Sequence, residues 1–128
     1  MKVDYLLTAD FVSADYAGKP VVYGVYTAIS PPHVPVVVNI GILCRLSDMP
    51  PHELSGTLTL TGVTGSIPLT IPIHVAPPST DGASGASFLA AAPVFIVQEG
   101  VLCISLELGE FTYRHEVPVV LKKGEVTP

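Results

Sequence analysis

The sequence predicts an all-β protein, a two-sheet antiparallel β-sandwich of about eight strands, on three observations. Short apolar runs alternate with polar residues at the two-residue period of a strand. Turn-sized gaps separate the runs, and the chain has 13 Pro and 11 Gly to form them. No stretch of useful length has helical periodicity, since residues 81–92 come nearest and lack an apolar stripe. Strands without helices pack as two sheets, here in one domain spanning residues 1–128.

The last third of the chain predicts a C-terminal three-strand meander. A two-residue loop at 109–110 sets Ile104 opposite His115, and a second loop at 99–100 sets Phe95 opposite Ile104. Both registers place apolar residues on one face of the sheet, and a register shift of one residue would distribute them over both faces. The three predicted strands are residues 88–97, 101–108 and 111–121.

Five earlier strands are predicted from the same alternation. They are residues 3–12, 21–29, 36–46, 54–61 and 66–76. In the first two strands the odd-numbered residues are expected to face the core. These residues are Val3, Tyr5, Leu7, Ala9, Phe11, Val21, Tyr23, Val25 and Ile29.

A tight loop at 63–64 predicts a hairpin in which Leu58 faces Leu69 and Ile67 points inward. Pro68 and Pro72 share one parity in the second strand of this hairpin, so both remove donors from the same lateral edge. We therefore expect that strand to lie at the edge of its sheet.

Two segments are expected to lie outside the sandwich. Residues 76–87 are small, polar and rich in Gly and Pro, which predicts a flexible surface loop. Residues 124–128 are predicted to form a tail.

The chain is poor in charge. Charged residues make up 13% of it and its net charge is −5, whereas about 25% is usual. Six Lys and Arg cannot form the basic stripe that binds nucleic acid, so no nucleic-acid partner is expected. Mean hydropathy is +0.55, yet no run reaches the roughly 18 apolar residues of a transmembrane segment. Low charge with high hydropathy favours a homo-oligomer or a protein assembly.

Asp4 and Asp10 lie where a signal peptide would have its apolar core, so we expect no export signal and a cytoplasmic protein. Reduced thiols are the default there. Alternation also places Cys44 inward and Cys103 outward, whereas a disulfide needs two thiols that face each other. Two structural cysteines are therefore expected.

No catalytic, cofactor-binding or metal-binding site is predicted. The four histidines, at 33, 52, 74 and 115, have no His or Cys partner at metal-ligand spacing. His74 is expected to face outward. His115 has inward parity, which predicts a core or rim histidine, with a ligand or base at the mouth of the sandwich as the alternative.

Two other functions remain open for the loop residues Asp10, Asp15, His33 and His52. They could serve a metal-dependent enzyme that uses calcium or zinc. They could also hold calcium in a sandwich that binds membranes. Whether these side chains converge decides both alternatives.

The N-terminal pattern is an aromatic-apolar strand ending in Asp, a loop with Gly-Lys, and a second strand with a central Gly. The matching positions are Tyr5, Asp10, Gly18, Lys19 and Gly24. This pattern resembles a family of small uncharacterised bacterial β-sandwich proteins, a domain of unknown function. The C-terminal residues EGVLCISLELGEFTYRHEVPVVL also resemble that family's closing hairpin. The chain departs from the pattern in having Pro20 after Gly-Lys and few charges. The resemblance implies a β-sandwich and no catalytic residue.

These observations together predict a non-enzymatic β-sandwich that acts by binding or assembly and self-associates. Nothing in the sequence identifies a small-molecule ligand.

Overall fold

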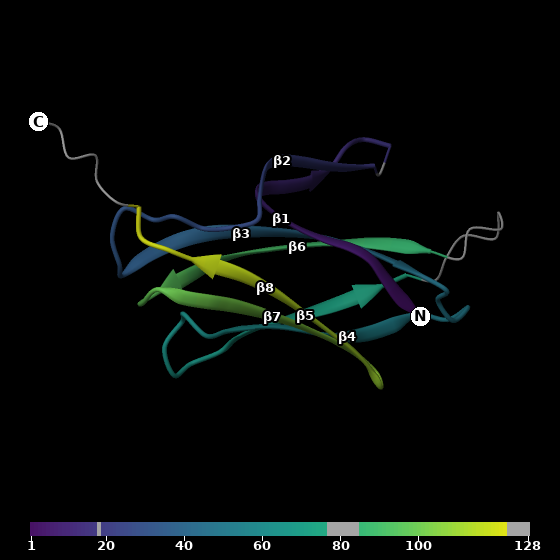
Figure 1. The fold of residues 1–128 in the computed structure, drawn as a ribbon. Coiled ribbons are helices and arrows are strands. Elements are labelled where there is room, and N and C mark those ends of the chain that lie inside the picture. Colours follow the sequence, from purple (N-terminus) through teal and green to yellow (C-terminus); the bar gives the residue numbers. More distant parts are fainter. Residues whose placement is uncertain (18, 77–84, 123–128) are drawn as a thin grey trace, which may run out of the picture.

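The structure is a computed structural model that describes residues 1–17, 19–76 and 85–122 (Figure 1). Within these ranges the secondary structure is all β, and no helix could cross a membrane. The strands are β1 (Lys2–Ala14), β2 (Pro20–Tyr26), β3 (Val36–Ser47), β4 (Leu54–Thr61), β5 (Leu69–Val75), β6 (Ala86–Ile96), β7 (Gly100–Leu108) and β8 (Phe111–Val119).

The eight strands form two antiparallel sheets of four, so the predicted β-sandwich is confirmed. One sheet has the order β2-β1-β3-β6 and the other the order β5-β4-β7-β8. Alternate residues of β3, β4, β6 and β7 fill the space between the sheets. The largest fully buried side chains are Ile40, Ile42, Leu46, Leu58, Leu60, Ile96, Leu102, Ile104, Leu106 and Leu108.

Only the second half of the predicted meander is confirmed. β7 and β8 pair as expected, with Ile104 opposite His115. The first half was wrong, because β6 pairs with β3 in the other sheet. The connection after β6 crosses between the sheets, where the Val97 N–H donates to the Val63 carbonyl (2.8 Å). Phe95 is consequently 54% exposed rather than buried.

A register shift in β1 reverses its predicted face at Tyr5, Leu6, Thr8 and Phe11, whereas Ala9 is buried as predicted. The ladder with β3 shifts between Val3 and Tyr5, so one extra residue lies in β1 there. An extra residue turns every later side chain to the opposite face. Leu6 and Thr8 are therefore buried, whereas Tyr5 and Phe11, which were predicted to be inward, are exposed.

β1 leaves β3 after Ala9 and doubles back, so that its second half and β2 lie over the outer face of the β3–β6 sheet (Figure 1). We call residues 9–14 of β1 together with β2 the ribbon. A Cβ on Gly41 would lie only 3.0 Å from a methyl carbon of Val12, so the ribbon packs closely on β3 at this glycine. The odd residues of β2, which were also predicted to be inward, are exposed on the ribbon's other face.

For the β4–β5 hairpin, the predicted strand faces are correct and the predicted register is wrong. Leu58 lies opposite Ile71 rather than Leu69. The connection is longer than predicted, and a shift of two residues leaves each side chain on the same face. Ile67 precedes β5 and is 77% exposed rather than inward. β5 lies at a sheet edge, as Pro72 predicted.

Parts of the predicted loop and tail cannot be compared with the structure. Residues 77–84 and 123–128 lie outside the described residues, and so does Gly18. The segment predicted as a loop at 76–87 ends earlier than expected, since Ala86 and Ser87 already belong to β6.

Candidate functional site

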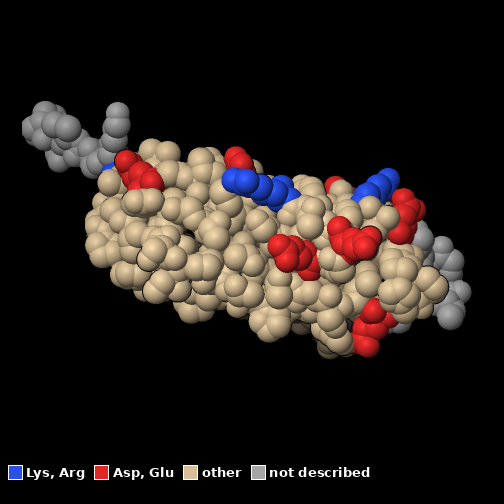
Figure 2. Space-filling model, turned by 90° about the horizontal axis from the view of Figure 1, so that it is seen from below, with Lys and Arg blue, Asp and Glu red and all other residues tan. Residues whose placement is uncertain are grey.

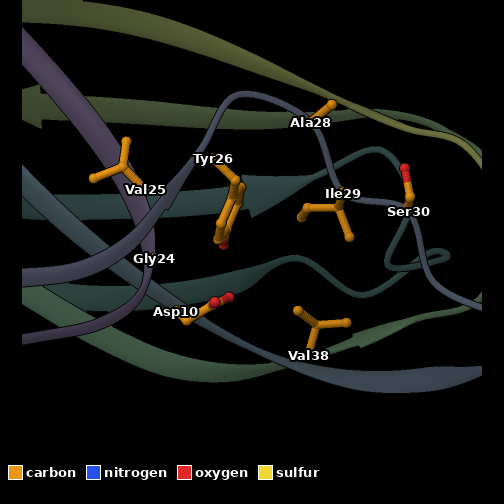
Figure 3. A pocket seen from close by; sticks show the side chains of 8 residues that line it. All are labelled: Asp10, Gly24, Val25, Tyr26, Ala28, Ile29, Ser30 and Val38. Carbon is orange, nitrogen blue, oxygen red and sulfur yellow. The ribbon is translucent and has the colours of Figure 1, made fainter.

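A pocket lies at the base of the ribbon, where the chain leaves β2 and turns towards β3 (Figure 3). Its volume is about 280 Å³. The residues that line it are Asp10, Gly24, Val25, Tyr26, Ala28, Ile29, Ser30 and Val38. Asp10 is the one charged side chain among them, and most of the others are apolar. The side chains of Asp10 and Tyr26 point towards each other across the pocket (Figure 3).

Asp10 holds its position because residue 24 is glycine. Gly24 lies in β2 between two residues that pair with β1, Tyr23 and Val25, and its φ is +71°. A Cβ on Gly24 would lie 2.4 Å from Asp10 Oδ2, well inside van der Waals contact. Glycine therefore meets two needs at this position, the positive φ and the space that the carboxylate occupies.

Tyr26 is held by its backbone and has a free hydroxyl. Thr8 Oγ1 donates a hydrogen bond to the Tyr26 carbonyl (2.6 Å), and Thr8 is itself buried. The Tyr26 hydroxyl oxygen is buried without a hydrogen-bond partner among the described residues. Burial, and secondarily the nearby Asp10 carboxylate, raises the pKa of Tyr26 to about 12. The phenol therefore stays neutral and keeps its proton at physiological pH.

The ribbon carries an exposed apolar surface. Phe11 and Tyr23 are cross-strand partners and are 55% and 73% exposed. Val25 and Val21 lie on the same face, as their pairing with Ala9 and Ser13 shows, and are 56% and 43% exposed. We call these four residues the ribbon face. It contains no charged side chain, and it remains uncovered by the rest of the described chain.

Charge is also unevenly distributed on the opposite side of the molecule. Figure 2 views the molecule from below and shows Asp, Glu, Lys and Arg gathered over part of the surface, with a broad area free of charge beside them. The charge-poor composition thus leaves large uncharged areas on the described surface.

The loop residues considered for a metal site have separate structural roles. Asp10 lines the pocket. Asp15 Oδ1 accepts hydrogen bonds from the backbone N–H groups of Ala17 (2.9 Å) and Lys19 (2.8 Å) and so closes the β1–β2 loop. His52 Nδ1 lies 3.1 Å from the Glu53 carbonyl oxygen, and His33 lies in the β2–β3 connection. Among the described residues, no three His, Cys, Asp or Glu side chains gather as a metal site would require.

The placement of the two cysteines is confirmed. Cys44 is buried in the core, and burial, with a smaller contribution from Asp4, raises its pKa to about 12. Cys103 lies on the outer face of its sheet, where the Arg114 guanidinium contacts its sulfur (3.0 Å). Both are free thiols.

His115 is partly buried opposite Ile104, as predicted, and burial lowers its pKa. A lowered pKa keeps the imidazole neutral near neutral pH. His115 thus fits the predicted role of a rim histidine.

One polar cluster was missed because its members come from two strands. His74 contacts the Ser55 hydroxyl through Nδ1 (2.8 Å) and the Glu53 carboxylate through Nε2. Ser55 and His74 are cross-strand partners at the start of β4 and the end of β5. The cluster is solvent-exposed, which favours a polar contact that secures the edge strand β5. The spacing of the residues in the sequence could not have shown it without the correct hairpin register.

No protein-family model and no curated protein matches this chain. The pocket and the ribbon face are therefore the features of the molecule that indicate a function.

Proposed function

We propose that this protein is a non-enzymatic assembly module that self-associates through the ribbon face. The single observation that carries the proposal is the cross-strand pair Phe11 and Tyr23, which is mostly exposed together with two valines on one face of the ribbon. A contiguous apolar surface of this kind marks an interaction site more often than scattered apolar residues do. Aromatic residues also contribute most strongly to protein interfaces.

A second copy of the same chain is the occupant that fits best. The ribbon face has no charge, whereas the chain has a net charge of −5. Copies that meet through the ribbon face bury apolar surface and leave their acidic residues elsewhere in water. Burial of apolar surface contributes about 25 cal/mol per Å², and this term drives the association.

The ribbon is also suited to a two-fold contact. In a symmetric dimer the same surface patch meets itself, so residue i contacts residue j and j contacts i. Phe11 and Tyr23 lie side by side on neighbouring antiparallel strands. A two-fold axis through the ribbon face would stack Phe11 of one copy on Tyr23 of the other.

Sedimentation velocity over micromolar to millimolar protein concentrations tests this proposal. We expect the wild-type sedimentation coefficient to rise with concentration, and Tyr23→Ser to abolish the rise. Ile67→Ser is the matched control, because Ile67 is equally apolar and 77% exposed but lies before β5, away from the ribbon. A concentration-independent monomer, or equal loss of association in both variants, would contradict the proposal.

A further inference from the structure

The pocket at the base of the ribbon contains a hydrogen-bond donor, the Tyr26 hydroxyl, and a hydrogen-bond acceptor, the Asp10 carboxylate (Figure 3). The Tyr26 hydroxyl is buried and has no hydrogen-bond partner among the described residues. The Asp10 carboxylate is solvent-exposed and makes no hydrogen bond or ion pair with the described part of the chain. A neutral phenol can donate a hydrogen bond, and an ionised carboxylate can only accept one.

We propose that this pocket binds a small neutral ligand that carries hydroxyl groups, a polyol or a monosaccharide. One ligand hydroxyl can accept the Tyr26 O–H and at the same time donate its own proton to Asp10. This binding goes beyond self-association and does not depend on it, because Asp10 and Tyr26, the two polar groups of the pocket, are not part of the ribbon face, and only Val25 borders both features.

Other classes of ligand satisfy only one of the two groups. An ammonium group donates to Asp10 but has no lone pair to accept the Tyr26 O–H. A carboxylate or phosphate accepts from Tyr26 but meets the negative charge of Asp10. An ammonium group would leave the buried Tyr26 hydroxyl without a partner, and an anion would be repelled by Asp10, so the hydroxyl class is favoured over both.

The rest of the lining suits the carbon skeleton of such a ligand. Ile29 and Val38 offer apolar contacts to C–H groups, and Ser30 adds a hydroxyl at the border. The volume of about 280 Å³ lies just below the usual range for ligand pockets, about 300–1,000 Å³. The ligand is therefore small.

The two polar groups are held in place before a ligand arrives. Gly24 leaves the space that the Asp10 carboxylate occupies, and Thr8 anchors the Tyr26 backbone. Preorganisation of this kind reduces the entropy lost on binding.

Two-dimensional ¹H–¹⁵N NMR titration of the whole chain with glycerol and, separately, with glucose tests the proposal. We expect saturable shifts at the amides of Gly24, Val25 and Ile29, with Kd about millimolar for ligands of this size. Tyr26→Phe removes the hydroxyl and keeps the ring, so affinity should fall about threefold to tenfold. Tyr16→Phe, which removes a hydroxyl from a fully exposed side chain in the β1–β2 loop, should bind like the wild type.

Any one of three results with the wild type and Tyr26→Phe would overturn the proposal. They are the lack of a saturable shift at the pocket with either probe, binding of butylammonium in preference to both, and unchanged affinity in Tyr26→Phe. Asp10→Asn provides a second variant that preserves side-chain shape. It should also weaken binding of both probes, and unchanged affinity there would equally overturn the proposal.

Discussion

The Asp10 carboxylate occupies the space that a side chain at residue 24 would need. A Cβ on Gly24 would lie 2.4 Å from Asp10 Oδ2 and 3.0 Å from its Cγ. The two residues are 14 positions apart in the chain and belong to β1 and β2. This contact gives a physical reason for an Asp at position 10 and a Gly at position 24.

Gly24→Ala should be more destabilising than Gly109→Ala. Both glycines have positive φ, +71° and +60°, so alanine costs about 1–2 kcal/mol at either position. A Cβ on Gly109 meets nothing within 4 Å, whereas at Gly24 it forces Asp10 out of its rotamer. The free energy of unfolding should therefore fall by about 1 kcal/mol more for Gly24→Ala.

Urea denaturation of the two variants measures this difference. Adding Asp10→Ala to Gly24→Ala should recover most of the extra loss, because the two closest atoms, Oδ2 and Cγ, are gone and only Cβ remains at 3.1 Å. If the double variant is no more stable than Gly24→Ala alone, the contact with Asp10 is not the cause.

Tyr26→Phe should stabilise the ligand-free protein by about 1 kcal/mol. The substitution removes a buried hydroxyl that has no partner among the described residues, and such a group carries an uncompensated desolvation cost. Thermal unfolding at neutral pH would show a raised midpoint. Tyr23→Phe, at an exposed position, should leave the midpoint within experimental error, and a lowered midpoint for Tyr26→Phe would contradict this expectation.

The raised pKa of Tyr26 predicts that the free energy of unfolding falls at alkaline pH. The pKa of Tyr26 is about 12 in the folded protein and near 10 in the unfolded chain. Between these values the unfolded state binds fewer protons, so the free energy of unfolding falls as pH rises above 10. Unfolding measured from pH 9 to 11 should show a shallower decline in Tyr26→Phe than in the wild type. Equal declines would show that Tyr26 does not contribute.

Leu106→Ala should cost about 2–5 kcal/mol, through lost burial and the cavity left behind. Leu106 is fully buried in β7, between Leu58 on β4 and Tyr113 on β8. Thr59→Ala, on the outer face of β4, should cost no more than about 0.5 kcal/mol. Chemical denaturation ranks the two variants, and a Thr59→Ala as damaging as Leu106→Ala would mean that the outer face of β4 is itself buried in an assembly.

The two thiols should differ in their reactivity. Cys44 is fully buried and its pKa is raised to about 12, so it carries almost no thiolate at neutral pH. Cys103 is partly exposed and lies beside Arg114. An aromatic disulfide reagent should therefore modify one thiol per chain in the native protein and two after denaturation. Modification of Cys44 before unfolding would contradict the core placement.

Local sequence patterns correctly predicted the structural features that depend on residues close together in the sequence. The two-residue turn at Gly109-Glu110 specifies its own register, so the β7–β8 hairpin was correct. The apolar run at the end of β6 has no polar residue to mark its outer face, so alternation alone could not separate Phe95 from Val94 and Ile96. Whether β6 pairs with β3 or with β7 depends on contacts between residues far apart in the sequence. No local sequence pattern specifies such contacts.

The same dependence on distant contacts explains why the sequence did not predict the ribbon face and the pocket. Leu6 and Leu7 are both apolar, so the register shift after Val3 left no trace in the pattern. That shift places Phe11 on the exposed face of the ribbon. The pocket also depends on the sharp departure of β1 from β3 after Ala9, which brings Asp10 beside Tyr26. Self-association stays a prediction from composition, because it was inferred from total charge and hydropathy and not from the placement of any residue.

The proposed self-association through the ribbon face is tested most directly by intermolecular nuclear Overhauser effects. An equimolar mixture of ¹³C,¹⁵N-labelled and unlabelled protein, measured with isotope filtering, reports only contacts between two copies. We predict contacts that join Phe11 of one copy to Tyr23 of the other and extend to Val21 and Val25. Intermolecular contacts confined to other surfaces, or none at millimolar concentration, would contradict the proposal.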